Sequence, residues 1–294
     1  MISWLLQGGP QDAKHRGKVH PVVTFCLHYA IVACVSFTAH DWMVTRELSN
    51  TNPTSTFCTV PPMRKSIGVF FGFYFVLFFA SRLALRWRQD IFYVEFYRQT
   101  FLCSVTIFHV ALGLYTGRIV LAQSFCVAVG IDQLLWYVDL TGYLLLHKFP
   151  IGVSEYLFWP GTTWASRLTS THHLWTIPLV LYASGSGLHP LSFPLSVLLV
   201  LVNVLLSRLL TPHSIASTDD ADDETKKKHP PHYLNLNLAY ELWSDIKNFP
   251  FLLVLEDRLP YLFRLFVAWW SFNAIVFAFL SYISTRMFGP PLIC

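Results

Sequence analysis

The chain has 294 residues, of which 54% are hydrophobic and only 13% are charged. Because water-soluble domains carry about a quarter charged residues, this composition excludes a soluble globular protein. The formal net charge of +4 is modest, and the one dense basic cluster, Lys226 to Lys228, directly follows the acidic run Asp219 to Glu224. A mixed run of this kind is typical of a solvated loop, so we expect no binding to nucleic acid.

The hydropathy pattern predicts an all-α fold, a polytopic transmembrane helix bundle of about seven spans. A span needs about 20 mainly apolar residues to cross a hydrocarbon core of about 30 Å. The fifth candidate is short and contains Pro178, and the fourth is long enough that it is either tilted or extends beyond the membrane. The candidates are Val22–Ala39, Ser66–Leu85, Thr100–Tyr115, Ile119–Leu146, His173–Ser184, Phe193–Leu210 and Phe263–Ser284.

The basic residues predict the direction of these spans, because loops on the cytoplasmic side collect Lys and Arg. With seven spans and a cytoplasmic N-terminus, sixteen of the 21 Lys and Arg residues fall on the cytoplasmic side. The remaining five are Arg46, Arg64, Lys65, Arg118 and Arg286. Removing or merging one span spoils this asymmetry, so the predicted count and the predicted orientation support each other.

The long loop before the last span has two parts of different composition. Residues 211–232 are polar, with prolines at both ends, and we expect them to be disordered. In Tyr233–Asn248, Leu238, Leu242 and Ile246 recur every four residues, which predicts an amphipathic helix in the membrane interface, although its LNLNL start is equally typical of a short strand. The expected organisation is a cytoplasmic segment at 1–21, a six-span bundle at 22–210, a disordered loop at 211–232, an amphipathic interfacial segment at 233–260, and a final span with a short tail at 261–294.

Five polar or aromatic residues form a stripe along the fourth span. They step by four, three, four and four residues, which places them on one face of a helix. Ionisable groups inside a membrane are costly and therefore mark candidate functional sites. The alternative, without a functional site, is that the acids near the helix end are hydrated or paired with arginine. The stripe consists of Asp132, Trp136, Asp139, Tyr143 and His147.

The next span opens with His172 and His173, which the predicted topology brings to the same leaflet as the stripe. Imidazole changes charge near neutral pH and therefore suits proton transfer or metal ligation. Adjacent residues on a helix point about 100° apart, so usually only one of the two can face a given site. Histidines at a membrane interface also occur simply because they hydrate well there.

Four further polar residues within the spans have a structural interpretation. His28 and His109 lie in the first and third spans, and two facing histidines can ligate a haem. Each of these spans carries only one such histidine, so polar packing across helices is the favoured interpretation. Asn203 and Asn273 are single polar residues in their spans and are expected to join helices.

The sequence gives no positive sign of a metal or another cofactor. The six cysteines show no CxxC pair or other spacing typical of metal ligands, and four of them lie in apolar runs. We therefore expect no bound metal and no cofactor. The cysteines are Cys26, Cys34, Cys58, Cys103, Cys126 and Cys294.

One arrangement of motifs resembles a known family. A helix ending in Asp139–Lys148 (DLTGYLLLHK) precedes a loop and then the His172-His173 pair, and Tyr240–Lys247 (YELWSDIK) precedes the final span. Over roughly Asp132 to Ser284 this resembles the TLC-domain proteins, the ceramide-synthase-like family. The resemblance implies acyl-CoA-dependent lipid synthesis or, in non-catalytic relatives, lipid sensing and trafficking, in the endoplasmic reticulum membrane.

Two departures qualify the resemblance. The acidic pair that ceramide synthases carry one helix after the histidines is absent, because that span is composed of plain Leu and Val. Fatty acid elongases need the pattern HxxHH, and Thr169 occupies its first position here. The missing acids favour a divergent member without the standard reaction.

Our leading hypothesis is a membrane protein of lipid metabolism that carries out acyl transfer or binds lipid at the cytoplasmic leaflet. His172 or His173 would act as general base, and Asp139 would orient it. The expected partners are membrane lipids and acyl-CoA, while protein partners stay open. The residues expected to bind substrate are Asp132, Trp136, Tyr143 and His147.

Two alternatives belong to other classes of protein. In a proton- or ion-coupled transporter, Asp132 and Asp139 would line an ion path, although the lack of internal repeats counts against the folds built from duplicated halves. In a non-catalytic membrane subunit or trafficking factor, the aromatic faces of the helices would bind partners. Loss of ion flux in Asp132→Asn, or stable co-purification of a partner, distinguishes these alternatives.

Overall fold

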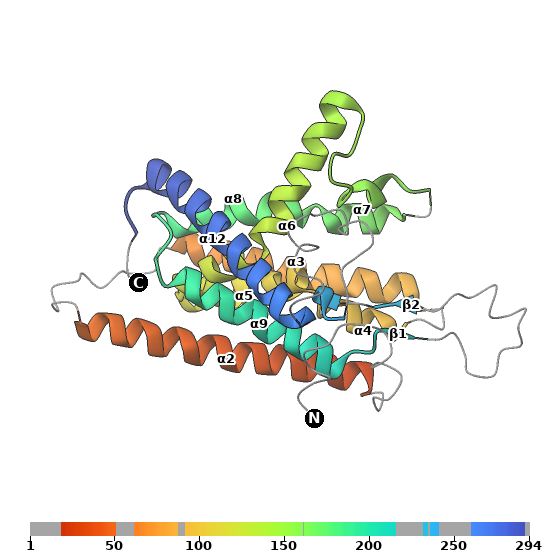
Figure 1. Ribbon diagram of the computed structural model, residues 1–294, viewed down its shortest axis with the longest axis horizontal. Coiled ribbons are helices and arrows are strands. Elements are labelled where there is room, and N and C mark those ends of the chain that lie inside the picture. Colours follow the sequence, from red (N-terminus) through yellow and green to blue (C-terminus); the bar gives the residue numbers. More distant parts are fainter. Residues whose placement is uncertain are drawn as a thin grey trace, which may run out of the picture.

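The computed structural model describes residues 19–50, 62–87, 92–160, 162–215, 232–234, 236–240 and 260–291. These residues are almost entirely helical, apart from one antiparallel pair of two-residue strands (Figure 1). The α-helices are α2 (Pro21–Asn50), α3 (Pro62–Arg86), α4 (Val94–Arg98), α5 (Leu102–Thr116), α6 (Ile119–Leu146), α7 (Trp164–Ser170), α8 (His172–Ser184), α9 (Ser192–Leu210) and α12 (Tyr261–Phe288). The short elements are the 3₁₀-helices η2 (Glu155–Phe158) and η3 (Leu236–Leu238) and the strands β1 (Ser214–Ile215) and β2 (His232–Tyr233).

Each of the seven apolar stretches coincides with one helix. Five of these helices, α2, α3, α6, α9 and α12, are long and apolar enough to cross a membrane, which is the architecture of a helical membrane protein. With 15 and 13 residues, α5 and α8 are only about 22 and 20 Å long at a rise of about 1.5 Å per residue. Most residues of α5 are buried inside the bundle, so its length does not have to match the thickness of the lipid.

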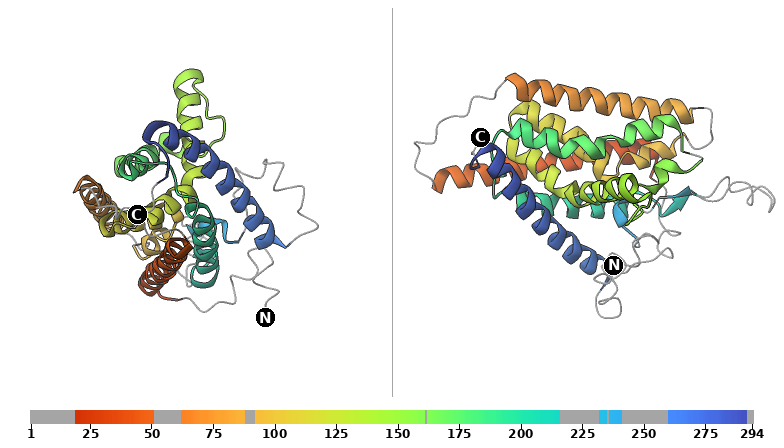
Figure 2. Two further views of the ribbon diagram at one scale, coloured as in Figure 1. Left: turned by 90° about the vertical axis from the view of Figure 1, so that its left-hand side faces the viewer. Right: turned by 90° about the horizontal axis from the view of Figure 1, so that it is seen from above.

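Hydrogen bonds at the two ends of the bundle show how the helices alternate in direction. At the end where α2 begins, the hydroxyl of Thr24 donates to the carbonyl of Leu210 at the end of α9 (3.1 Å). At the opposite end, Arg64 at the start of α3 donates to the carbonyl of Ser184 at the end of α8 (2.8 Å). Helices α2 and α9 therefore run in opposite directions, as do α3 and α8, while α12 crosses the bundle obliquely (Figure 2). We call the end where α2 begins the entry end.

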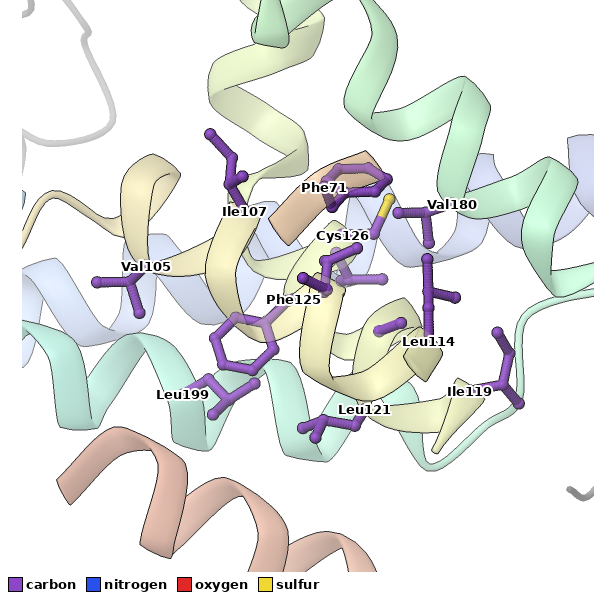
Figure 3. Packing of buried hydrophobic residues seen from close by; sticks show 14 of the residues in the cluster. Phe71, Val105, Ile107, Leu114, Ile119, Leu121, Phe125, Cys126, Val180 and Leu199 are labelled. Atoms are coloured by element: carbon purple, nitrogen blue, oxygen red, sulfur yellow. The ribbon is translucent and has the colours of Figure 1, made fainter. Parts of the chain in front are cut away.

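The hydrophobic core surrounds the hairpin of α5 and α6. In a close view of the core, Phe71 of α3, Val180 of α8 and Leu199 of α9 lie around Phe125 and other side chains of that hairpin (Figure 3). The first half of α6 is buried, whereas its last residues, Leu144 to Leu146, are exposed. The last part of α6 extends out of the bundle (Figure 1), so the fourth span is long because it continues beyond its packing partners.

Polar side chains join the helices where the sequence predicts it. The ring Nε2 of His28 in α2 lies 2.9 Å from the amide oxygen of Asn203 in α9. The amide nitrogen of Asn273 in α12 donates to the hydroxyl of Ser196 in α9 (3.2 Å). Such bonds satisfy groups that lipid cannot, so the joining roles predicted for Asn203, Asn273 and His28 are confirmed.

Of the two starts predicted for the segment from Tyr233, the described residues show the strand and not the amphipathic helix. Tyr233 belongs to β2, and the following turn of η3 is buried, with Asn237 in the left-handed region (φ 54°). The side chain of Asn237 accepts a bond from the amide of Leu102 and donates to the carbonyl of Thr100 and the hydroxyl of Ser207 (2.7, 2.9 and 2.8 Å). Leu238 is therefore buried against the entry end, and Leu242 and Ile246 lie outside the described residues.

The first part of the same loop is ordered at its edges. Ser214 pairs with Tyr233 and Ile215 with His232 in the two-stranded sheet. The disorder predicted for 211–232 therefore does not extend to these edges, and residues 216–231 lie outside the described part of the chain.

Candidate functional site at the entry end

The histidine pair is positioned by two consecutive helices, α7 and α8. The hydroxyl of Thr163 accepts a bond from the amide of Ser166 (3.1 Å) and so caps the start of α7. Thr171 then separates α7 from α8, whose first two residues are His172 and His173. Both side chains are buried, with 3% and 6% of their surface exposed. The local sequence therefore inserts two imidazoles into the bundle at its entry end.

The tautomer of His172 follows from its bond to the backbone. Its Nδ1 lies 2.6 Å from the carbonyl oxygen of Thr169, and a carbonyl can only accept, so Nδ1 carries the proton. Nε2 then has a free lone pair, and this buried atom has no hydrogen-bond partner among the described residues. The rings of Tyr74 and Phe78 lie 6.3 and 5.8 Å away and pack around the imidazole.

His173 lies between an aromatic ring and a carboxylate. Trp136 stacks on its ring at 4.7 Å with an interplanar angle of 20°. Its Nδ1 lies 3.5 Å from Oδ2 of Asp132, which is too long for a good hydrogen bond. In contrast to the buried histidines, Asp132 has 37% of its side-chain surface exposed. Asp132 is thus the accessible group of this pair.

Both histidines face the same place, although two adjacent residues of a helix usually do not. The two ring centroids are only 4.1 Å apart. Both imidazoles therefore belong to one candidate site.

Cys103 completes the cluster, and sequence reasoning missed it. The sulfur of Cys103 and one ring nitrogen from each histidine lie within 4.8 Å of one another. Cys103 is the second residue of α5, 69 positions before His172, so no local spacing links the two. The only available signal was that both residues start helices at the same end of the bundle.

The loop between α6 and α7 adds Tyr156 to the neighbourhood. Its hydroxyl donates to the hydroxyl of Ser170 (2.9 Å), and its ring lies 6.1 Å from that of Trp136. Burial raises the pKa of Tyr156 well above its ordinary value, and the nearby Cys103 and Asp132 raise the pKa further. Tyr156 is therefore a neutral hydrogen-bonding group close to the cluster.

Asp139 does not orient a histidine, so the role predicted for it is wrong. One of its oxygens accepts bonds from the amides of Ile151 (2.7 Å) and Gly152 (3.1 Å), and the other accepts from the amide of Ser154 (2.9 Å). A completely buried carboxylate with three amide donors anchors the loop that follows α6. The carboxylate beside His173 is Asp132.

The predicted stripe on α6 therefore divides into two functions. Asp132 and Trp136 face His173, whereas Tyr143 packs on the rings of Phe149 and Phe158 at 4.7 and 4.3 Å. His147 ends α6 in the left-handed region (φ 51°) and is exposed. Tyr143 and His147 hold the loop and the helix end, so the structure does not bring them to the histidine pair.

The second pair of histidines is packed as part of the core. Nε2 of His28 is bonded to Asn203, and Nδ1 of His109 lies 2.7 Å from the carbonyl oxygen of Val105 in its own helix. The ring of His109 is stacked between Phe125 (4.8 Å) and Tyr29 (5.9 Å). Aromatic rings occupy the space beside His109 that a haem would need.

No family model, no curated protein and no solved structure matches this chain. The resemblance to TLC-domain proteins therefore stays a prediction. What the protein does has to be inferred from the side chains at the entry end.

Proposed function

We propose that this protein is a membrane enzyme of lipid metabolism that carries out acyl transfer on a lipid at Asp132, His172 and His173. The observation that carries the proposal is the carboxylate of Asp132, which keeps 37% of its side-chain surface exposed and lies 3.5 Å from the buried ring of His173. Ionisable groups are costly inside a membrane and persist where they have a function. Acyl transfer needs a group that takes a proton from the attacking hydroxyl, amine or water.

We assign Asp132 as the group that contacts the substrate and takes its proton. It is the exposed member of the cluster, so an attacking hydroxyl can reach it, whereas the histidines lie behind it. Tyr156 is a neutral phenol whose hydroxyl donates to Ser170 (2.9 Å), and by turning away from Ser170 it would donate to a substrate carbonyl oxygen instead. A base and a neutral donor on one site are the minimum that acyl transfer requires.

The apolar surface near the end of α6 favours a lipid substrate. Leu144 to Leu146 are exposed on α6, and Phe158, Trp159 and Trp164 are exposed on the following loop and helix. Exposed aromatic side chains of this kind are typical of the membrane interface. An acyl chain that lies along this surface can reach Asp132 sideways from the bilayer, and acyl-CoA is the donor that the TLC resemblance implies.

We further infer seven crossings, a cytoplasmic entry end and residence in the endoplasmic reticulum membrane. The alternating helix directions support seven crossings. The sixteen basic residues on one side support a cytoplasmic N-terminus. The proposed acyl-transfer site then faces the compartment that supplies acyl-CoA.

Of the two acids that would line the ion path of a transporter, Asp139 is not available. All three hydrogen bonds of Asp139 go to the backbone of the following loop, and its side chain is completely buried. An ion path along α6 would therefore depend on Asp132 alone. The geometry favours chemistry at Asp132 over conduction past it.

Lipid analysis of cells with and without the protein tests the proposal. Lipids are extracted and quantified by mass spectrometry, and any species whose level depends on the wild-type chain serves as the readout. We expect Asp132→Asn, His172→Ala and His173→Ala to lower the rate at which that species forms by about a hundredfold, the contribution of a lost proton acceptor.

Two matched variants control for loss of charge or of imidazole elsewhere. Asp41 is an exposed carboxylate paired with Arg118 through two bonds of 2.9 Å at the opposite end, and His20 is exposed before α2. Asp41→Asn and His20→Ala should keep the wild-type rate. Wild-type rates in all three site variants, or no lipid species that depends on the protein, would exclude the proposed enzyme.

A further inference from the structure

We propose that Cys103, His172 and His173 bind a zinc ion. The proposed metal site goes beyond the lipid reaction and rests on different observations, namely the convergence of a thiol and two imidazoles and the lack of a hydrogen-bond partner for one nitrogen of each imidazole. A thiolate and two neutral imidazoles are a ligand set that zinc accepts in proteins.

The distances fit a metal better than they fit hydrogen bonds. The sulfur of Cys103 and the two ring nitrogens all lie within 4.8 Å of one another. In a tetrahedral zinc site, with bonds of about 2.0 to 2.3 Å, ligand atoms are about 3.4 to 3.6 Å apart. The three atoms have to close by about 1 Å, which rotations of the three side chains can supply.

Two buried nitrogen atoms lack a partner that a metal would provide. Nε2 of His172 and Nδ1 of His173 make no hydrogen bond within the part of the chain that the structure describes. Buried polar atoms are nearly always satisfied, so an unsatisfied pair beside a thiol requires an explanation. The other nitrogen of His172 is bonded to the carbonyl of Thr169, the usual way in which a metal-binding histidine is oriented.

The charges also balance in a site inside the bundle. A zinc ion with the thiolate of Cys103 and the carboxylate of Asp132 beside it is neutral overall, which reduces the cost of burying each charge. Asp132 Oδ2 lies 3.5 Å from Nδ1 of His173, so the carboxylate is beside the proposed ligands. Zinc with three protein ligands and one open position is typical of catalytic sites.

Metal analysis of the purified full chain tests the site. The protein is isolated in mild detergent through an affinity tag that contains no histidine, and its metal content is measured by mass spectrometry. We expect about one zinc per chain in the wild type and less than a tenth of that in Cys103→Ser, His172→Gln and His173→Gln. Cys126→Ala removes a different thiol, one buried in the core, and should keep the zinc.

Cobalt substitution identifies the ligands independently. Cobalt(II) in place of zinc should give a thiolate charge-transfer absorption that is lost in Cys103→Ser and kept in Cys126→Ala. A wild-type chain that is folded, shown by a cooperative thermal transition, and yet binds neither equimolar zinc nor cobalt overturns the proposal. Equal loss of metal in Cys126→Ala and Cys103→Ser overturns it as well.

The failure of this proposal can be distinguished from failure of the lipid reaction. We expect Asp132→Asn to keep its zinc while lipid turnover falls. A chain without zinc that still changes cellular lipids overturns the metal site alone. A zinc-bound chain that changes no lipid overturns the acyl-transfer proposal alone.

Discussion

At the scale of single residues, two aspartates on α6 show how position decides the function of a carboxylate. Asp132 is partly exposed and has His173 beside it, whereas Asp139, two turns later, is buried and bonded to three amides. Both lie on the same helical face in the sequence. The difference arises because the loop that follows α6 folds back over Asp139 and leaves Asp132 uncovered.

The loop-anchoring role of Asp139 predicts a local effect of its removal. Hydrogen bonds to a charged group contribute about 1.5 to 3 kcal/mol each, so Asp139→Ala, which removes three of them, should lower the local stability of the loop by at least about 4 kcal/mol. Hydrogen exchange at the amides of Ile151, Gly152 and Ser154 should then accelerate by about a thousandfold. Asp139→Asn keeps an acceptor oxygen and should have a smaller effect.

The control for this prediction is the metal content. Because Asp139 makes its three bonds to the loop, zinc binding at Cys103 should persist in Asp139→Ala. Unchanged exchange at the three amides would contradict the anchoring role.

At the scale of elements, the close contact of α3 with α5 depends on one glycine. A Cβ added at Gly68 would lie 2.9 Å from the amide nitrogen of Tyr115 and 3.0 Å from the carbonyl oxygen of Ala111. Both are backbone atoms of α5, which cannot move aside as a side chain can. At Gly72, one turn later, an added Cβ would meet only the Cβ of Ala111, at an ordinary 3.8 Å.

The two glycines therefore form a matched pair for a stability measurement. Gly68→Ala should lower the free energy of unfolding by about 1 to 3 kcal/mol, the usual cost of overpacking. Gly72→Ala should leave it unchanged or raise it by up to about 1 kcal/mol, because alanine favours helix. Thermal unfolding in detergent measures both, and equal midpoints for the two variants would contradict the close contact.

At the scale of the whole molecule, the loop between α6 and α7 distinguishes seven crossings from five. If α5 and α8 do not cross, the N-terminus and residues 216–231 still lie on one side, but the loop after α6 moves to the opposite side. A tag in that loop is therefore informative, and the exposed turn around Trp159 is a suitable position.

An epitope placed after residue 160 tests the predicted topology. With only the plasma membrane permeabilised, antibody should reach this epitope and one at the N-terminus, but not one placed within 51–61. Seven alternating helices predict this pattern because each crossing reverses the side. Protection of the epitope after residue 160, with the N-terminal one accessible, would indicate five crossings.

Local pattern predicted most of the helices and much less of the site. The seven apolar stretches each form a helix, because hydropathy and helical period are properties of neighbouring residues. The leucine spacing from Leu238 onward predicted a helix, but the chain at Leu236–Leu238 is a buried 3₁₀ turn. There the bonds of Asn237 to Thr100, Leu102 and Ser207 override local periodicity, and these partners are distant in the chain.

The sequence by itself determined that this is a helical membrane protein, where its seven apolar helices lie and that His172, His173 and Asp132 are unusual. Composition and period suffice for that, since each apolar stretch must satisfy its own backbone bonds in lipid. Only the tertiary structure decided that Cys103 joins the histidines and that Asp139 belongs to a loop. Those contacts exist because α5, α6 and α8 pack together at the entry end, and packing between distant segments leaves no periodic trace in the sequence.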